Sequence, residues 1–451
     1  MTKLSRPPGS FREVARGALA NERMQDVLDV ATANLRDLRL GAWAQLDDAE
    51  ALREQGREAR TRAIKNLSRY LDEFQGNVEA RGGHVHRCST DAEAAETIAD
   101  ICRSVGASLV AKSKSMASEE IGLNDALEAE GVRVVETDLG EYILQLAGEH
   151  PVHIVAPAIE KTREDVAKLL ESVDGEPVDR ELSAMTAKAR RQLREVFLTA
   201  DVGVTGANFA VAETGSICLV TNEGNGRLVS TLPRVHVAIL GLERIVANTH
   251  DLATCLKLLA RSATAQRLTT YTTLITGPRR DGEEDGPEEL HVIVLDNGRS
   301  SLLGTRYEEM LNCIRCGACL NVCPIYRKSG GAAYGPVYSG PMGAVLVPLL
   351  AKAPDLPHAS SLCGACTQAC PVKIPLHELL LELRRDLVDD RVASWWERAA
   401  FTLWSLAWSS RLGYRATTRL ARLGQPLAPS LSQPWSRGRA LPRLQRRYRD
   451  R

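Results

Sequence analysis

The sequence predicts an α/β protein with three additional parts, and three observations lead to this fold class. Short runs rich in β-branched residues alternate with helical patterns through the middle of the chain. Seven of the eleven cysteines fall between positions 313 and 370, and the C-terminal segment is rich in arginine and tryptophan. We therefore expect a helical N-terminal arm at 1–80, an α/β domain at 81–300, an α-helical cysteine-rich module at 301–390 and a basic helical extension at 391–451.

Length and composition are those of an ordinary folded protein. The chain has 451 residues, 57 basic and 57 acidic side chains, and 44% hydrophobic residues, which excludes a collagen, a disordered chain and a small disulfide scaffold. The N-terminus lacks the apolar stretch of a secretory signal, and no run of about 18 uncharged apolar residues predicts a membrane span. We expect a cytoplasmic protein, in which clustered cysteines usually bind metal.

The order of predicted elements supports the α/β assignment. Apolar residues at helical spacing over 11–80, without a strand-like run, predict the arm. Farther on, strands separated by helical patterns of about 10–20 residues predict βαβ units and a mostly parallel sheet. A charged stretch with glycine and proline at 277–287 predicts an exposed loop. The candidate strands are Ser108–Ala111, Arg133–Glu136, Val152–Ala156, Val202–Thr205, Ile217–Thr221, Val235–Leu240 and Val292–Leu295.

The first cysteine run has a spacing typical of ligands to an iron–sulfur cubane. The run from Cys313 to Cys323 follows the pattern C-x2-C-x2-C-x3-C-P, in which the first three thiolates bind one [4Fe–4S] cluster. Gly317 gives the backbone freedom to pass close to inorganic sulfide. The fourth cysteine of such a run reaches a second cluster.

A second run, from Ser360 to Cys370, ends in the same C-x3-C-P pattern. Aligning the two ends places Ser360 where the first run has Cys313, and it predicts two [4Fe–4S] clusters with crossed ligands. One cluster then lacks a fourth cysteine; Ser360, water, a group of a partner or no ligand at all could occupy that position. Cluster one takes Cys313, Cys316, Cys319 and Cys370, and cluster two takes Cys323, Cys363 and Cys366.

Zinc is the alternative to iron, since paired CxxC units also bind zinc. A structural zinc site needs four ligands per ion, however, and does not require two C-x3-C-P endings, so the sequence favours iron–sulfur. The remaining cysteines are scattered, and we expect them to be small buried hydrophobic residues. They are Cys88, Cys102, Cys218 and Cys255.

Two stretches of the α/β domain are candidates for a ligand pocket. Residues 112–116, Lys-Ser-Lys-Ser-Met, follow a predicted strand and open a helix, where backbone N–H groups favour an anion. The other stretch, 203–227, contains Glu213 among many glycines. We expect either turn glycines with one buried acid or a pocket built around Lys112, Lys114 and Glu213.

The extension at 391–451 differs in charge from the rest of the chain. It has thirteen Arg, no Lys and two acids, a net charge of +11, against −11 for residues 1–390. Five of the six tryptophans also lie in it. Such a segment can bind an anionic membrane peripherally or an acidic partner, and the alternative is that it packs on its own acidic body. No nucleic acid is expected, because no nucleic-acid-binding module accompanies the charge.

The two cysteine runs and their flanks closely resemble the bacterial lactate-utilisation protein B family. The resemblance includes the glycine-rich segment 330–343 between the runs and the stretch Ser361–Cys366. It continues upstream through Lys112–Met116, Glu213–Gly215 and Thr231–Pro233 and covers nearly the whole chain. It implies a lactate-utilisation-type domain related in fold to the CoA-transferase and ribose-5-phosphate isomerase group, and the same crossed pattern of seven cysteines.

The resemblance also implies a cytoplasmic complex with lactate-utilisation proteins A and C that oxidises L-lactate to pyruvate. The leading hypothesis is an electron-transfer iron–sulfur subunit that passes electrons from lactate to an unidentified acceptor, and not a stand-alone enzyme. In a variant of it, an open iron on cluster two binds substrate as a Lewis acid. A second hypothesis makes the α/β domain the catalytic or ligand-binding unit, and a third makes the chain an assembly scaffold.

Overall fold

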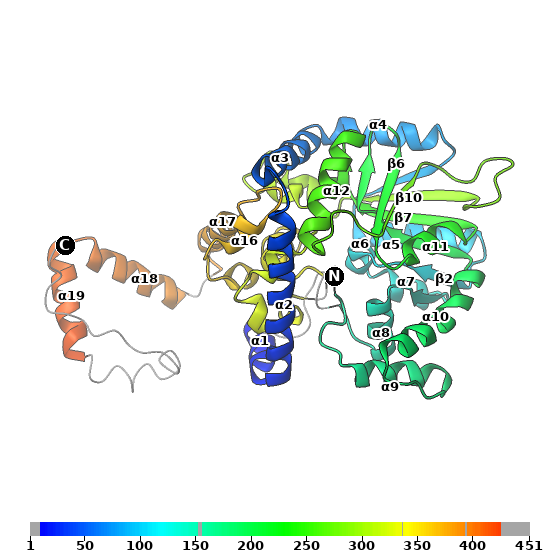
Figure 1. Cartoon of the computed structure of the whole chain (residues 1–451). Helices are drawn as coiled ribbons and strands as arrows, with labels where there is room; N and C mark the ends of the chain where they lie inside the picture. The colour runs from blue at the N-terminus through cyan, green and yellow to red at the C-terminus, as the bar shows by residue number, and fades with distance from the viewer. Residues whose placement is uncertain (1–9, 152–155, 336, 393–394, 425–451) are drawn as a thin grey trace. The chain divides into compact units, whose positions relative to one another are not determined.

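The computed structural model describes residues 10–151, 156–335, 337–392 and 395–424 (Figure 1). The chain divides into two compact units, Met1–Arg384 and Arg385–Arg451. The candidate strand at 152–156 falls largely on residues 152–155, which lie outside the described residues. All candidate site residues belong to the first unit.

The centre of the first unit is a six-stranded sheet in which every pairing is parallel. This confirms the parallel sheet predicted from the alternation of strands and helices. All seven residues of the central strand β7 are buried, as expected for a strand covered on both faces. In sheet order the strands are β1 (His84–Cys88), β10 (Glu289–Leu295), β7 (Val235–Gly241), β4 (Val202–Gly206), β2 (Leu109–Lys112) and β3 (Arg133–Glu136).

The predicted strand at 217–221 lies in a second, four-stranded sheet and not in the parallel one. A short turn joins it to the preceding strand, with Gly215 in a left-handed conformation (φ +67°). So short a connection leaves no room for a crossover helix, and the two strands pair antiparallel. In sheet order the strands are β8 (Ile245–Val246), β5 (Phe209–Val211), β6 (Ser216–Thr221) and β9 (Tyr271–Ile275).

Helices cover both faces of the parallel sheet. On one face, Ile98 of α5 and Leu127 of α7 share a core with alternate strand residues such as Val237. The other face is covered by α4 and the second sheet over β7 and β10, and by α8–α10 over β2 and β3. The helices of this domain are α5 (Asp91–Ser104), α6 (Met116–Ile121), α7 (Leu123–Ala129), α8 (Leu139–Ala147), α9 (Arg163–Asp174), α10 (Leu182–Thr199), α11 (Asn225–Thr231) and α12 (Thr249–Ala263).

Two smaller predictions for this domain are confirmed. The charged loop at 277–287 connects β9 to β10 and is mostly exposed. The four scattered cysteines are all buried. Their exposed fractions of 0–3% agree with a packing role and not with reactivity.

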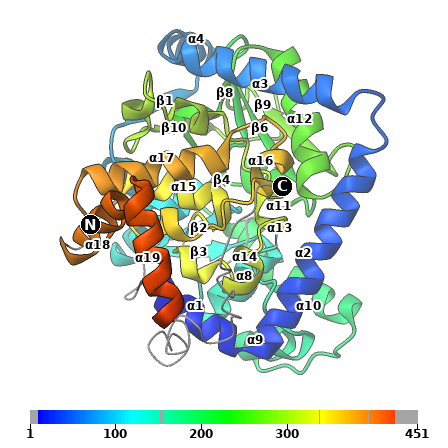
Figure 2. The same cartoon turned by 90° about the vertical axis from the view of Figure 1, so that its left-hand side faces the viewer.

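The N-terminal arm is helical, as its apolar spacing predicts. Asn21 and Asp48 cap two of its helices by accepting hydrogen bonds from the Met24 and Ala51 N–H groups. The second helix contacts the cysteine-rich segment, and Figure 2 shows it alongside α13 and α14. The helices are α1 (Phe11–Ala20), α2 (Glu22–Trp43), α3 (Ala49–Lys65) and α4 (Leu67–Glu79).

The cysteine-rich segment consists of short helices and loops. Its core is continuous with apolar residues of α2, α3, α12 and the second sheet, so the segment and the α/β domain share one packed interior. Apolar residues at 376–388 recur at helical spacing, and this stretch forms a helix. The elements are η3 (Glu308–Asn312), α13 (Ala318–Asn321), α14 (Tyr326–Ser329), α15 (Gly340–Leu350), α16 (Ala365–Ala369) and α17 (Leu376–Asp389).

The second unit contains two helices, α18 (Trp395–Trp408) and α19 (Arg411–Gly424), which pack on each other. The ring of Trp408 meets the ring of Tyr414 edge to face, with centroids 5.1 Å apart. Neither helix has a buried residue. Among the described residues, no helix combines the length and apolar character needed to cross a membrane.

Candidate functional site

Four of the seven clustered cysteines line one small cavity: Cys313, Cys316, Cys319 and Cys370. Three come from the loop before α13 and from that helix, and the fourth comes from the end of α16. Gly317 has a φ of +74° at the N-terminus of α13, a conformation that glycine adopts without strain. The turn that it permits brings the thiols on either side of it into the same cavity. We call these four residues the first cysteine set.

Burial favours the protonated thiol at three members of the first cysteine set, Cys316, Cys319 and Cys370. It raises the pKa of Cys370 to about 12, with Cys316 adding to the effect, and the pKa of Cys316 to about 11. Burial, followed by Cys316 and Cys313, also raises the pKa of Cys319. Metal ligation requires thiolates, so a cluster bound here would displace protons.

Arginines surround the first cysteine set. Arg39 (8% exposed) and Arg60 (0%) come from the N-terminal arm and are buried, as is Arg244 (5%), which follows β7. Burial, and then the charge of Arg60, lower the pKa of Arg244 to about 10. Four arginines donate hydrogen bonds to backbone carbonyls of the segment: Arg39 to Ala369 (2.8 Å), Arg53 to Cys370 (2.9 Å), Arg60 to Leu311 (3.1 Å) and Arg244 to Cys313 (2.7 Å).

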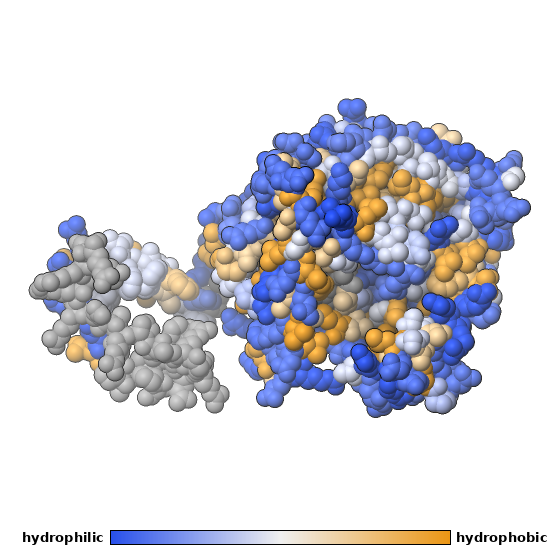
Figure 3. All heavy atoms as spheres, viewed as in Figure 1, coloured by the Kyte–Doolittle hydropathy of each residue, from blue (hydrophilic) through white to orange (hydrophobic). Residues whose placement is uncertain are grey.

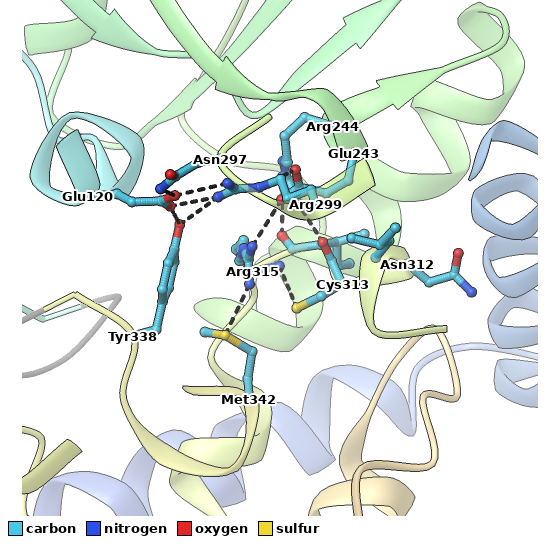
Figure 4. A network of polar contacts seen from close by, with 12 residues as sticks. Glu120, Glu243, Arg244, Asn297, Arg299, Asn312, Cys313, Arg315, Tyr338 and Met342 are labelled. Atoms are coloured by element: carbon cyan, nitrogen blue, oxygen red, sulfur yellow. Dashed lines mark hydrogen bonds and ion pairs between the residues drawn. The ribbon is translucent and has the colours of Figure 1, made fainter. Parts of the chain in front are cut away.

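Arg315, which lies between two of the cysteines, extends this group into a buried ion-pair network (Figure 4). Its guanidinium lies 2.9 Å from Glu243 and 4.7 Å from the centroid of the Tyr338 ring. Glu243 also pairs with Arg299 (2.9 Å), which makes two hydrogen bonds to Glu120 (2.6 and 2.9 Å). The Tyr338 hydroxyl donates to Glu120 as well.

The network fixes the charge state of its members. Burial alone would raise the pKa of Glu243, yet Arg299 and Arg315 bring it down to about 2. Arg299 likewise outweighs burial at Glu120 and lowers its pKa. Both acids are therefore anionic. Against these two buried carboxylates, the site contains the largely buried Arg315 and four buried arginines: Arg39, Arg60, Arg244 and Arg299. Since unpaired buried charge is costly, this excess of cations fits an anionic group, such as a cubane held by four thiolates.

The other three cysteines, Cys323, Cys363 and Cys366, lie together in a different environment. The thiolates of Cys323 and Cys363 add to burial in raising the pKa of Cys366 to about 11. The Ala365 N–H, followed by the Ser361 hydroxyl, lowers the pKa of the exposed Cys363. We call these three residues the second cysteine set.

The surroundings of the second cysteine set are aromatic and hydroxyl-bearing. Tyr334 contacts Cys323 and lies 6.2 Å from Tyr326 between ring centroids. Ser360, at the position that lacks a cysteine, accepts a hydrogen bond from the Leu362 N–H (3.1 Å). The charge of Cys366 acts on Cys319 of the first cysteine set, so the two sets are neighbours.

A cavity of about 280 Å³ lies at the carboxyl ends of the parallel strands β2, β4 and β7. This is the edge at which open parallel sheets usually bind ligands. Gly241, at the end of β7, allows this packing, because a Cβ atom there would lie 2.2 Å from Glu243 Oε2. Arg315 lines both this cavity and the cavity of the first cysteine set. The α/β domain and the cysteines are therefore separated by a single side chain at this point.

The three pocket candidates do not lie together. Lys114 lines the 280 Å³ cavity. Lys112 is fully buried beneath it in ion pairs with Glu119 and Glu136, each at 2.6 Å. Glu213 is exposed and accepts a hydrogen bond from the Thr249 N–H at the start of α12 (3.2 Å). Lys112 is the last residue of β2, whereas Lys114 lies beyond the strand, in the loop before α6.

Sequence reasoning missed most of the charged network. Glu243 and Arg244 directly follow a predicted strand, which is a signal that could have placed them at the ligand edge of the sheet. Arg60 and Glu120 lie on helices without any motif around them. Their role depends on contacts between segments more than 100 residues apart, so no local pattern identifies them.

Comparison with known proteins adds two family matches. Residues 71–295 match the LUD domain, and residues 309–374 match the 4Fe-4S dicluster domain. The second match favours iron–sulfur over zinc for the cysteines.

Whole-chain relatives extend the comparison. The chain is 46% identical to Lactate utilization protein B of Bacillus subtilis over 433 residues, which covers 95% of this chain and 89% of that protein. It is 48% identical to Lactate utilization protein B of Macrococcus caseolyticus over 385 residues, or 84% and 81% of the two chains. A crystal structure of a DUF162 family protein from Deinococcus radiodurans aligns with 51% of this chain and 98% of its own, at 15% identity and a TM-score of 0.29. The chain is thus 46% identical to a lactate utilization protein B over 95% of its own length, and it contains a 4Fe-4S dicluster segment. It therefore belongs to the lactate utilization protein B family.

Proposed function

We propose that this protein is the electron-transfer iron–sulfur subunit of a complex that oxidises L-lactate to pyruvate. The observation that carries the proposal is the convergence of seven cysteines on two neighbouring sites inside a chain whose relatives are named for lactate utilization. The first cysteine set would hold one [4Fe–4S] cluster and the second cysteine set the other. When bound, such clusters accept and release single electrons.

The protein's own residues would then set the conditions for that chemistry. Buried arginines neutralise the thiolates of the first cysteine set, and the Cys313 and Cys370 sulfurs accept hydrogen bonds from the Arg315 and Ile374 N–H groups (3.4 and 3.3 Å). Hydrogen bonds and charges near the sulfurs tune iron–sulfur potentials. The exposed Cys363 gives the second cysteine set access to the surface, where another protein could exchange electrons with it.

The finer division of the chain belongs to the same proposal. It comprises an arm at 1–80, a lactate-utilisation-type α/β domain at 81–300 related to the CoA-transferase group, a two-cluster module at 301–390 and an extension at 391–451. Three arginines of the arm contact the backbone of the cysteine-rich segment. The arm would therefore act as a structural part of the cluster module and not as a free appendage.

Lactate-utilisation proteins A and C are the proposed partners, together with an acceptor of electrons. Apolar side chains gather along α2 on the face seen in Figure 3, and Val30 and Leu38 of this helix are more than half exposed. Exposed apolar patches of this kind often mark protein–protein contacts. The patch lies on the helix that contacts α13, so a partner bound there would approach the cysteines.

Peripheral membrane contact through the extension is a separate part of the proposal. In α18 and α19, tryptophans and leucines are exposed, among them Trp395 (79%) and Leu412 (79%), while α19 carries four arginines. Basic helices with exposed tryptophan bind anionic membrane surfaces. Removing residues 391–451 should abolish co-sedimentation with vesicles containing anionic lipid; unchanged sedimentation of the truncated protein would contradict this part.

The test of the proposed function is anaerobic electron paramagnetic resonance of the full chain with L-lactate. We expect reduced-cluster signals only when proteins A and C are also present. Absence of those signals with all components present would contradict the proposal. Normal lactate oxidation by a complex whose subunit lacks iron and sulfide would instead support the scaffold hypothesis.

A further inference from the structure

One wall of the 280 Å³ cavity carries polar groups that the protein leaves without partners. Ser113 and Asn225 are each only 5% exposed and line the cavity. Within the described part of the chain, neither side chain has a hydrogen-bond partner. Their polar atoms border the cavity and are not sealed in the closed interior, so water or a ligand inside the cavity can satisfy them. Both side chains open onto the same space.

Lys114 adds a positive charge to this wall. It follows Ser113 after β2, and among the described residues its ammonium group has neither an ion-pair nor a hydrogen-bond partner. Two acids line the cavity nearby, but backbone N–H groups already bind both of them. Asp138 accepts from Gly140 and Glu141 at the start of α8, and Glu223 accepts from Leu139. The charge of Lys114 acts on Glu223 and opposes the rise in its pKa that burial and Asp138 cause. Among the described residues, however, no acceptor is hydrogen-bonded to the ammonium, the hydroxyl or the amide.

The other cations that line the cavity are already engaged. Arg299 and Arg315 bind Glu243, and Arg244 donates to three backbone carbonyls. Among the described residues that line the cavity, Lys114 is therefore the cation left for an entering anion. Arg315 lines the same cavity and also the cavity of the first cysteine set.

We propose that this cavity binds a small 2-hydroxy carboxylate, whose carboxylate is held by Lys114, Ser113 and Asn225. Three donors around one space match the several acceptor positions of a carboxylate. A volume of about 280 Å³ is at the lower end for ligand pockets, which suits a small acid with a few waters. The identity of the acid as lactate rests on the proposed function, whereas the carboxylate site rests on the cavity itself.

Isothermal titration of the anaerobically reconstituted full chain with L-lactate tests the site. We expect saturable binding by the unaltered protein, weaker binding of propionate, which lacks the hydroxyl, and none of chloride. Lys114→Met should raise the Kd for L-lactate at least about tenfold. Lys257→Met, which changes an exposed lysine of α12, is the matched control and should leave the Kd unchanged. Equal affinity in Lys114→Met and the unaltered protein, or no binding by either, would overturn the proposal.

A second variant guards against misfolding of the first. Asn225→Asp keeps the size of the side chain and adds a negative charge, so it should also weaken L-lactate binding. Its iron content and circular dichroism spectrum should match those of the unaltered protein, which shows that it folds. Unweakened binding in this variant would again overturn the site. If binding follows these expectations but L-lactate never reduces the clusters in the presence of both partners, the carboxylate site stands and the proposed function fails. If the clusters are reduced normally in Lys114→Met and its Kd is unchanged, the function stands and the site is wrong.

Discussion

The two cysteine sets derive from two similar sequence runs, yet they lie in contrasting surroundings. The first cysteine set is enclosed by arginines of the arm and the α/β domain, with Arg39 and Arg60 buried. The second cysteine set has tyrosines and hydroxyl groups around it and an exposed member, Cys363. Since positive charge stabilises the more negative, reduced state of a cluster, we expect the first cysteine set to give the higher potential. The comparison teaches that the motif specifies the ligands, while distant segments specify the electrostatics.

The largest expected effect comes from removing a thiol from each set. Cys319→Ala should lose its cluster, about half of the iron and much of the folding yield, because the buried arginines remain without the anion that neutralises them. Cys363→Ala should lose a similar share of iron but fold with nearly normal yield. Iron analysis and soluble yield measure both effects. Cys255→Ala, at a buried cysteine outside the sets, is the control. Equal soluble yields of Cys319→Ala and Cys363→Ala would contradict the electrostatic difference between the two cysteine sets.

Arg299→Met tests the ion-pair network that supports the first cysteine set. The change leaves Glu120 and Glu243 buried without their shared partner, which should cost about 3–5 kcal/mol of folding free energy. Arg87→Met breaks an exposed pair with Asp72 and should cost about 0–1 kcal/mol. Chemical denaturation of the two variants, both with clusters, measures the difference. Similar midpoints for the two variants would mean that the network does not stabilise the site.

Arg315→Met should lower one of the two cluster potentials by tens of millivolts and leave the other unchanged. The charge of the guanidinium interacts with the Cys313 thiolate, and its loss removes positive charge that stabilises the reduced state. A redox titration followed by electron paramagnetic resonance measures both potentials. Arg306→Met, which changes an exposed arginine paired with Glu382, should shift neither. A potential that stays constant or rises in Arg315→Met would contradict the electrostatic difference between the sets.

The smallest effect is expected at Ser360. Its hydroxyl accepts the Leu362 N–H, a local bond whose loss costs about 0.5–1.5 kcal/mol. Ser360→Ala should therefore keep the full iron content and both spectroscopic signals, with only a slight loss of stability. Disappearance of one signal in this variant would mean that the serine oxygen is a ligand.

Local patterns in the sequence predicted the elements that depend on local order. The parallel strands and the helix at 376–388 follow from periodicity, and the convergence of Cys313 and Cys370 on one cavity follows from the alignment of the two runs. The short strands β5 and β8, of three and two residues, were missed, because their pairing depends on tertiary packing and not on propensity.

The pocket could be predicted only in part for the same reason. Lys114 lines the cavity, but Lys112, two residues earlier, is fully buried in ion pairs with Glu119 and Glu136. Asn225 becomes part of the site only because α11 packs against β4 and β7. Such contacts arise from the fold as a whole, and no motif in the sequence marks them.

The central claim is that seven cysteines hold two iron–sulfur clusters, and iron, zinc and acid-labile sulfide analysis of anaerobically purified protein tests it most directly. The account predicts about eight iron and eight sulfide per chain, without zinc. Zinc in place of iron, or iron without sulfide, would contradict it.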